Sequence, residues 1–295
     1  MTWFSAKRGV VRGTTAVWSG VGYIAGRVGR WKPALWDSRG GQRVLIVAPH
    51  PDDEVGCGGT LLLHQQAGDT VHITHVTDGR RSRAGGLGPD EMAERRRREA
   101  AAAGIAFGFS GTDWLGLHEG EWEQPGLVSL LLDALRRTRP HVVYAPSCVD
   151  FHPEHISVAR CLARAIAGLG SAGLIVRVYQ LQVPLTPLLV NRVALVQSAG
   201  DQLAAAMRCY VTQMGSIERC WRMKRYAAAF YGLPGIVEEF WQMDSAAYAR
   251  LHQAADPEPA AGAFRGVRSR PFTDPLSYLR GLGARRRLRK MSRPR

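Results

Sequence analysis

The chain has 295 residues, of which 45% are hydrophobic, enough for one large α/β domain with extensions. Its formal net charge of +14 indicates anionic surroundings, such as a membrane surface, nucleic acid or an acidic substrate, without choosing among them. No apolar run approaches the roughly 20 residues of a membrane-spanning helix. The five scattered cysteines contain no C-x-x-C pair, and their odd number in a large chain indicates reduced thiols in a cytosolic protein and not a disulfide framework. No signal-peptide pattern is present, so we expect a cytoplasmic protein.

Residues 1–42 are predicted to form a basic N-terminal extension. On a 3.6-residue helix one face carries the apolar residues Val10, Val17, Val21, Ile24, Val28 and Trp31, and the roughly opposite face carries Arg8, Arg12 and Arg30. This layout is typical of a helix that lies in a membrane interface, so a peripheral contact with an anionic membrane is one expectation. The alternative is that the apolar face packs on the remainder of the protein.

Strand-like and helical runs alternate between residues 43 and 250. Strands are expected at 43–49, 70–79, 141–147 and 173–183, and helices at 58–68, 89–105, 127–140, 154–170 and 201–231. Such alternation with near-continuous apolar strands predicts a Rossmann-like α/β fold, a mostly parallel sheet with helices on both faces. Residues 251–295 are predicted to be a basic extension rich in Pro, Gly and Arg, and its end could add attraction to an anionic membrane.

Two motifs follow predicted strands. "VAPHPDDEVGCGG" (47–59) crowds a histidine and three carboxylates after the first strand, and "SCVDFHPEH" (147–155) follows the third. Taken alone, the first motif could be a solvated turn, and the second could be a helix N-terminus. Because both follow strands of one parallel sheet, we expect them at the same rim, where ligands bind.

The two motifs together could assemble a metal site from His50, Asp53 and His155. Two histidines and one carboxylate with an open position are a catalytic zinc arrangement, although the pattern cannot separate zinc from another divalent ion. A cation would also relieve the repulsion among the crowded carboxylates.

Asp52 remains free beside the predicted metal and could accept a proton from water as general base. His152 could donate a hydrogen bond to a developing oxyanion. Glu154 could accept a hydrogen bond from a ring nitrogen and fix its tautomer. His118 lies in a polar loop that could line the pocket, and Arg80 is the other candidate for substrate binding.

"PHPDDE" at 49–54 followed by "HPEH" at 152–155 resembles the LmbE-like (PIG-L) N-acetylglucosaminyl deacetylases. Weaker matches are "THVTDGR", the pair Arg96 and Glu99, and "LGLHEGEW". The resemblance implies a Rossmann-like zinc enzyme, with the same three metal ligands, base and oxyanion partner as above. The family usually has Asp at the position of Glu154.

The leading hypothesis is therefore a zinc-dependent hydrolase with one ion per chain, which removes the N-acetyl group from an amino sugar or glycoconjugate. The alternative is a non-catalytic Rossmann-like protein that binds a membrane or nucleic acid through its basic termini. A binding module has no need of a free carboxylate such as Asp52 beside a metal, so nucleic acid is not the expected partner. A nucleotide-dependent oxidoreductase is disfavoured because "VGCGGT" supplies only G-x-G-G.

Overall fold

A computed structural model describes residues 3–38, 40–170, 173–185, 188–254 and 282–292. The strands are β1 (Ala34–Leu35), β2 (Arg43–Ala48), β3 (Thr70–Thr77), β4 (Gly111–Leu117), β5 (Val142–Pro146), β6 (Ile175–Tyr179), β7 (Arg192–Leu195) and β8 (Val237–Asp244). The longer helices are α1 (Trp3–Gly29), α2 (Gly58–Gln66), α3 (Pro89–Phe107), α4 (Gln124–Thr138), α5 (Pro153–Leu169), α6 (Gly200–Met207), α7 (Met214–Tyr231), α8 (Ser245–Ala254) and α11 (Leu282–Met291). A short 3-10 helix, η1 (Asp53–Gly56), follows β2.

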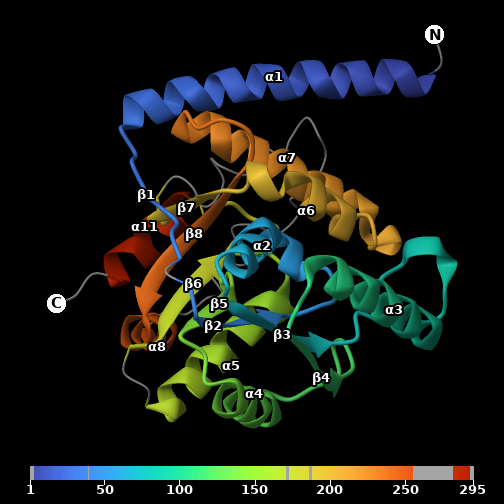
Figure 1. Cartoon of the computed structure of the whole chain (residues 1–295), viewed down its shortest axis with the longest axis vertical. Helices are drawn as coiled ribbons and strands as arrows, with labels where there is room; N and C mark the ends of the chain where they lie inside the picture. The colour runs from blue at the N-terminus through green and yellow to red at the C-terminus, as the bar shows by residue number, and fades with distance from the viewer. Residues whose placement is uncertain (1–2, 39, 171–172, 186–187, 255–281, 293–295) are drawn as a thin grey trace.

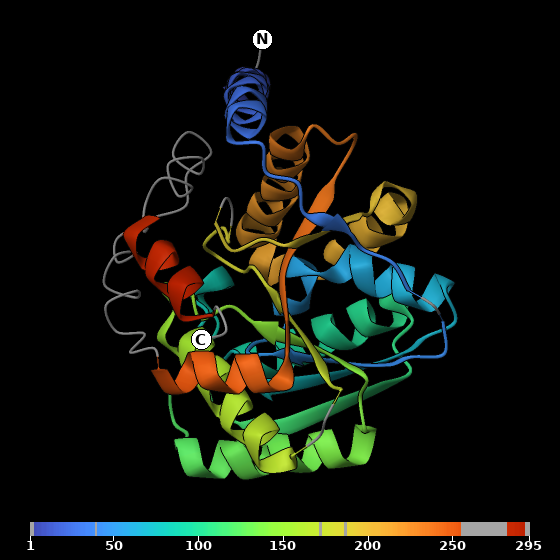
Figure 2. The same cartoon turned by 90° about the vertical axis from the view of Figure 1, so that its left-hand side faces the viewer.

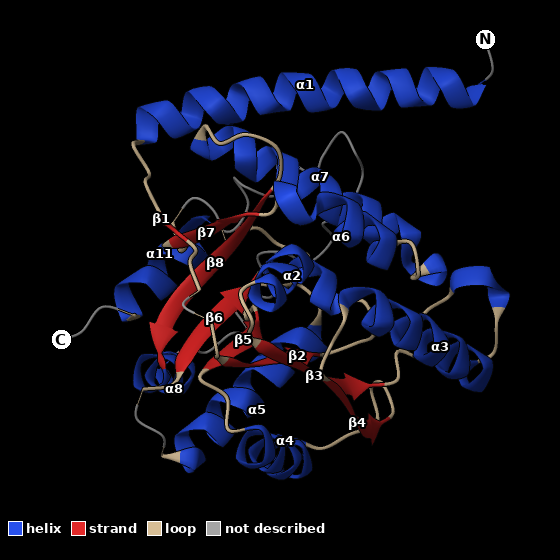
Figure 3. Cartoon of the chain, viewed as in Figure 1, coloured by secondary structure: helices blue, strands red, loops and turns tan. Residues whose placement is uncertain are grey.

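All eight described strands join one sheet in the order β1-β7-β8-β6-β5-β2-β3-β4 (Figures 1 and 3). Neighbouring strands are parallel except where β8 pairs antiparallel with β6 and β7. The chain runs outward from β2 through β3 and β4, and then returns to place β5 on the other side of β2. This reversal between β2 and β5 makes the topological switch point where ligands bind in such sheets.

Each face of the sheet has its own hydrophobic core, as the near-continuous apolar strands predict. Leu45 and Val47 of β2 pack with residues of α4, α5, α8 and α11. The alternate residues Val44 and Ile46 pack with α2, α3, α6 and α7 on the opposite face. The predicted mostly parallel α/β fold is confirmed.

Four strands extend the sheet beyond the four predicted ones. Residues 111–117 form β4, whereas β1, β7 and β8 lie beyond β6 on the other side. β1 belongs to the predicted N-terminal extension, and the boundary predicted at 250/251 falls within α8. Residues 255–281 and 293–295 of the predicted C-terminal extension lie outside the described residues.

Helix α1 crosses one end of the molecule and packs along α7 (Figures 1 and 2). The contact uses the small residues of α1, because Gly26 lies directly against the backbone of Phe230 and Gly22 approaches the same residue. The ring of Trp31, just after the helix, stacks on Phe230 at a centroid distance of 5.2 Å. Among the described residues, none of the helices has the length and hydropathy needed to cross a membrane.

Candidate metal centre

The two sequence motifs meet at the carboxyl ends of the adjacent strands β2 and β5. His50 follows β2 in a tight turn that continues into η1. Asp52 lies within this turn and has a φ of 112°, an uncommon backbone conformation for a residue other than glycine. His155 lies in the first turn of α5, whose N-cap is His152. The sheet topology therefore brings together residues that are far apart along the chain.

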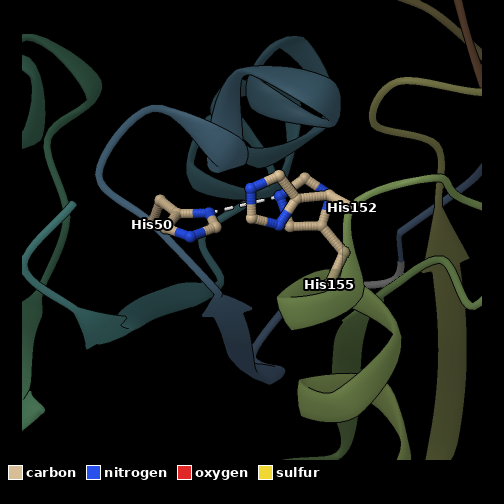
Figure 4. A group of neighbouring side chains, drawn as sticks. All are labelled: His50, His152 and His155. Carbon is tan, nitrogen blue, oxygen red and sulfur yellow. Dashed lines mark hydrogen bonds between the residues drawn. The ribbon is translucent and has the colours of Figure 1, made fainter. Parts of the chain in front are cut away.

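Three donor atoms converge in this loop pair. His50 Nδ1 lies 3.1 Å from Asp53 Oδ2 and 3.2 Å from His155 Nε2. His155 Nε2 lies 3.4 Å from the same Asp53 oxygen. Figure 4 shows the His50 and His155 rings facing each other across this gap, with His152 beside them. These are the three residues that the sequence predicts as metal ligands.

A carboxylate engages the opposite nitrogen of each of these two imidazoles. His50 Nε2 donates to Glu154 Oε2 at 2.6 Å, and His155 Nδ1 donates to Asp150 Oδ2 at 3.1 Å. When each imidazole is neutral and its single proton lies on the nitrogen that faces the carboxylate, His50 Nδ1 and His155 Nε2 both present lone pairs to the shared gap. This carboxylate–histidine arrangement is the usual outer shell of a protein-bound metal.

The donor set fits a divalent cation. A point roughly 2 Å from three donors spaced as these are matches zinc–nitrogen and zinc–oxygen bond lengths. Without a cation, protons on the two histidines have to balance the charge of the buried Asp53 carboxylate, and a divalent ion would take their place. Two other groups of neighbouring donors share His50, one with His152 and His155 and one with Glu119 and Glu154. Because Glu154 already binds His50 Nε2, the Nδ1 side is the better place for an ion.

The acid–base properties of the three donors reflect their mutual contacts. Burial disfavours the charged form of His50, but hydrogen bonds with Asp53 and Glu154 outweigh it and raise its pKa to about 9. Burial likewise opposes the charge on Asp53, whose pKa the two histidines nevertheless hold well below its usual range. The negative charge of Asp53 and its neighbours thus favours a positive charge in the gap.

Asp52 lies beside the donor set without belonging to it. Its Oδ1 accepts a hydrogen bond from the guanidinium of Arg96, which also donates to the backbone oxygens of Pro51 and Gly79. Burial raises the pKa of Asp52 to about 6, against the opposing effect of Arg96. A buried carboxylate held in one orientation, with its affinity for a proton raised, has the properties of a general base.

His152 is half-buried and packs against the rings of the other two histidines. Its ring stacks on His155 at a centroid distance of 4.5 Å and meets His50 edge-on at 4.8 Å. Its Nδ1 is buried without a hydrogen-bond partner among the described residues. Burial and the neighbouring histidines lower its pKa to about 4, so the ring is neutral near pH 7. A neutral imidazole with an unsatisfied buried nitrogen is suited to a ligand that enters the site.

The third carboxylate of the first motif, that of Glu54, points away from the donor set toward Tyr210. It is fully buried and hydrogen-bonded to the hydroxyl of Tyr210. Burial raises its pKa to about 8, so it is largely uncharged near neutral pH. The crowding apparent in the sequence is therefore relieved partly by the loss of this charge.

Arg80 and His118 lie together at the rim of the site, because both bind Asp78 at the end of β3. Arg80 Nε donates to Asp78 Oδ2 at 2.8 Å, and His118 Nδ1 lies 2.8 Å from the same oxygen. The next residue, Glu119, approaches His50 Nε2 at 3.7 Å. The two predicted substrate-binding residues are thus near the donor set but do not reach it.

Sequence reasoning missed three groups that hold this site in place. Asp150 orients His155 and also accepts from the backbone nitrogen of His152 at 2.9 Å. Arg96 orients Asp52, and the indole of Trp122 donates to Glu154 Oε1 at 2.8 Å. The matches at Arg96 and at "LGLHEGEW" were the available signals for two of them, whereas Asp150 stood within the second motif unassigned.

Part of the chain matches a known protein family. Residues 45–166 match the PIG-L family, described as GlcNAc-PI de-N-acetylase. This segment holds both motifs and is similar to the PIG-L (LmbE-like) family. The resemblance seen in the sequence is thereby confirmed.

Two curated relatives are deacetylases by name. The 1D-myo-inositol 2-acetamido-2-deoxy-alpha-D-glucopyranoside deacetylase of Saccharomonospora viridis is 29% identical over 154 residues, which are 42% of this chain and 57% of the relative. The probable N-acetyl-alpha-D-glucosaminyl L-malate deacetylase 2 of Bacillus cereus is 30% identical over 138 residues, 43% of this chain and 61% of the relative. The chain therefore spans little more than half the length of these relatives.

Among solved structures, the conserved protein TT1542 from Thermus thermophilus has a similar fold. It superimposes with a TM-score of 0.57 and is 29% identical, covering 68% of this chain and 93% of that one. The similarity supports the LmbE-like fold.

Proposed function

We propose that this protein is a metal-dependent hydrolase that removes the N-acetyl group from an amino sugar or a glycoconjugate. The observation that carries the proposal is the convergence of His50 Nδ1, Asp53 Oδ2 and His155 Nε2, with the carboxylate of Asp52 nearby but outside the donor set. The names of the relatives, which refer to deacetylation of compounds containing an acetylated glucosamine, support the substrate class.

We assign the metal to the three converging donors, with one zinc ion per chain as the first choice among divalent ions. When bound, such an ion acidifies water and polarises a carbonyl group. Glu154 and Asp150 hold the two histidines in the tautomer that leaves the ligating nitrogens free.

Asp52 accepts the proton of the attacking water and passes it to the leaving amine. Arg96 holds the carboxylate in place for both steps. His152 donates a hydrogen bond to the oxyanion that develops as the acetamide carbonyl is attacked. Arg80 and His118, which are fixed through Asp78, bind the sugar at the rim.

Acetate release tests the proposal. Purified protein, with and without added zinc, is incubated with a panel of N-acetylated sugars, nucleotide sugars and glycoconjugates. Asp52→Asn should reduce the rate by roughly 10²–10⁴-fold, because general-base catalysis contributes that much. The same variant should retain its metal and its unfolding temperature. An Asp52→Asn protein as active as the parent would refute the mechanism, and no acetate release from any compound would refute the activity.

A further inference from the structure

One face of α1 exposes aliphatic side chains that nothing in the described structure covers. Val17, Val21, Ile24 and Val28, here called the outer stripe, are exposed by 66%, 49%, 63% and 79% respectively. Successive members are three or four residues apart, so they form one continuous line along the helix. With Tyr23, α1 carries five of the nine large hydrophobic side chains that are exposed in the described residues.

This exposure results from the way α1 packs. A helix with one apolar stripe ordinarily buries that stripe against its own domain. Here the glycine face around Gly22 and Gly26 contacts α7, because the close approach of Phe230 leaves no room for a Cβ at Gly26. The outer stripe lies on the opposite side of the helix and faces away from α7. Among the described parts of the chain, these four side chains therefore do not follow the alternative in which the apolar face packs on the domain.

The positive charge near the outer stripe indicates what kind of surface would bind there. The first 36 residues include no Asp or Glu, and the first acidic residue is Asp37. Exposed Arg27, Arg30 and Lys32 lie at the end of the helix that adjoins Val28. A second copy of the same helix would bring like charges together, whereas an anionic lipid surface offers both acyl chains for the stripe and phosphates for the cations.

We propose that α1 lies flat on an anionic membrane surface, with its outer stripe in the acyl boundary and its basic residues at the lipid headgroups. The glycine face then connects this helix to α7 and so holds the domain at the surface. The proposal concerns a peripheral contact and does not depend on the proposed hydrolysis. The side chains of Arg8, Val10 and Arg12, part of the same predicted pattern, lie outside the described residues.

Vesicle binding by the full chain tests this. The probes are phosphatidylcholine vesicles with and without phosphatidylglycerol, at low and high salt. The variant Val21→Ser/Ile24→Ser/Val28→Ser removes most of the outer stripe. Ile105→Ser on α3 is the matched control, because Ile105 is an equally aliphatic side chain, 83% exposed, at a site remote in sequence. Unfolding temperatures verify that both variants fold.

The wild type should bind only the anionic vesicles and should dissociate as salt rises. The stripe variant should lose roughly ten-fold or more in partition coefficient, since apolar burial supplies much of the affinity. The Ile105→Ser control should match the wild type. The proposal is overturned if the wild type fails to bind anionic vesicles at low salt, or if the stripe variant binds as well as the wild type. A dimer that the stripe substitutions convert to monomer, without vesicle binding, would instead assign the stripe to a second copy.

Discussion

The candidate role of each histidine in the site follows from the partners of its ring nitrogens. His50 and His155 each give one nitrogen to a carboxylate and present the other to the gap beside Asp53. His152 has a buried Nδ1 that no described group satisfies. The same residue type therefore serves as candidate ligand in two positions and as candidate hydrogen-bond donor in the third.

Metal content distinguishes these roles. His50→Ala, Asp53→Ala and His155→Ala should each lose the metal, since each removes one of three converging donors. His152→Ala should keep it, because the carboxylate of Asp53 already completes the set. Metal analysis of the purified variants is the measurement. Loss of metal from His152→Ala, with retention by Asp53→Ala, would show that the three histidines are the ligands instead.

Packing of individual elements depends on residues that sequence patterns treat as unfavourable. β8 carries the consecutive acids Glu238 and Glu239, both buried, a pattern that is unusual for a buried strand. Glu238 is accommodated because it accepts from the backbone nitrogens of Gly59 and Thr60 at the start of α2 and pairs with Lys224 at 2.5 Å. The glycines of α1 similarly reduce helix propensity while allowing close contact with α7.

Two substitutions in α1 should have opposite effects. Gly26→Ala places a methyl group against Phe230, so α1 must shift away from α7. Gly20→Ala meets nothing within 4 Å and should stabilise the helix by about 1 kcal/mol. Hydrogen exchange of the α1 amides should accelerate in Gly26→Ala and slow in Gly20→Ala. Equal exchange in both variants would contradict the packing described.

At the scale of the whole molecule, a buried polar network links elements that are distant in the sequence. His64 of α2 donates through Nδ1 to Asp69 at 2.5 Å and accepts through Nε2 from the hydroxyl of Tyr144 at 2.9 Å. Arg177 of β6 donates to the same hydroxyl at 2.9 Å. Asp69 also accepts from the backbone nitrogen of Gln42, so the network ties the start of β2 to the core.

This network should make stability depend on pH. Burial, with a contribution from Arg177, lowers the pKa of His64 to about 4 from its usual 6.5. Between these values the unfolded chain binds a proton that the folded chain does not, so stability falls as pH decreases from about 6.5 to 4. One such group contributes at most about 1.4 kcal/mol per pH unit. The free energy of unfolding of His64→Gln, measured in urea, should change less steeply with pH across this window than that of the wild type. If the unfolding free energies of the two proteins changed with pH in parallel, His64 would not be the group responsible for the pH dependence.

The sequence by itself determined the central fold and the identities of the candidate site residues. Apolar runs with the period of strands and helices define β2, β3, β5, β6 and the helices between them, because both faces of a parallel sheet must be covered. The motifs also predicted His50, Asp53 and His155 as metal ligands, because histidine and aspartate are residue types that bind zinc.

Only the tertiary structure decided how those residues are supported and what α1 exposes. Arg96 contacts Asp52 across 44 residues of sequence, and Asp150 orients His155 through a side-chain contact that the motif itself does not specify. Glu54 is separated from the other acids because its burial beside Tyr210 favours the uncharged form. The amphipathic pattern of α1 allowed two packings, and the close approach of Phe230 to Gly26 selected the one that leaves the outer stripe exposed. Local periodicity says which residues share a face, whereas the neighbour that covers the face is set by the packing of segments far apart in the chain.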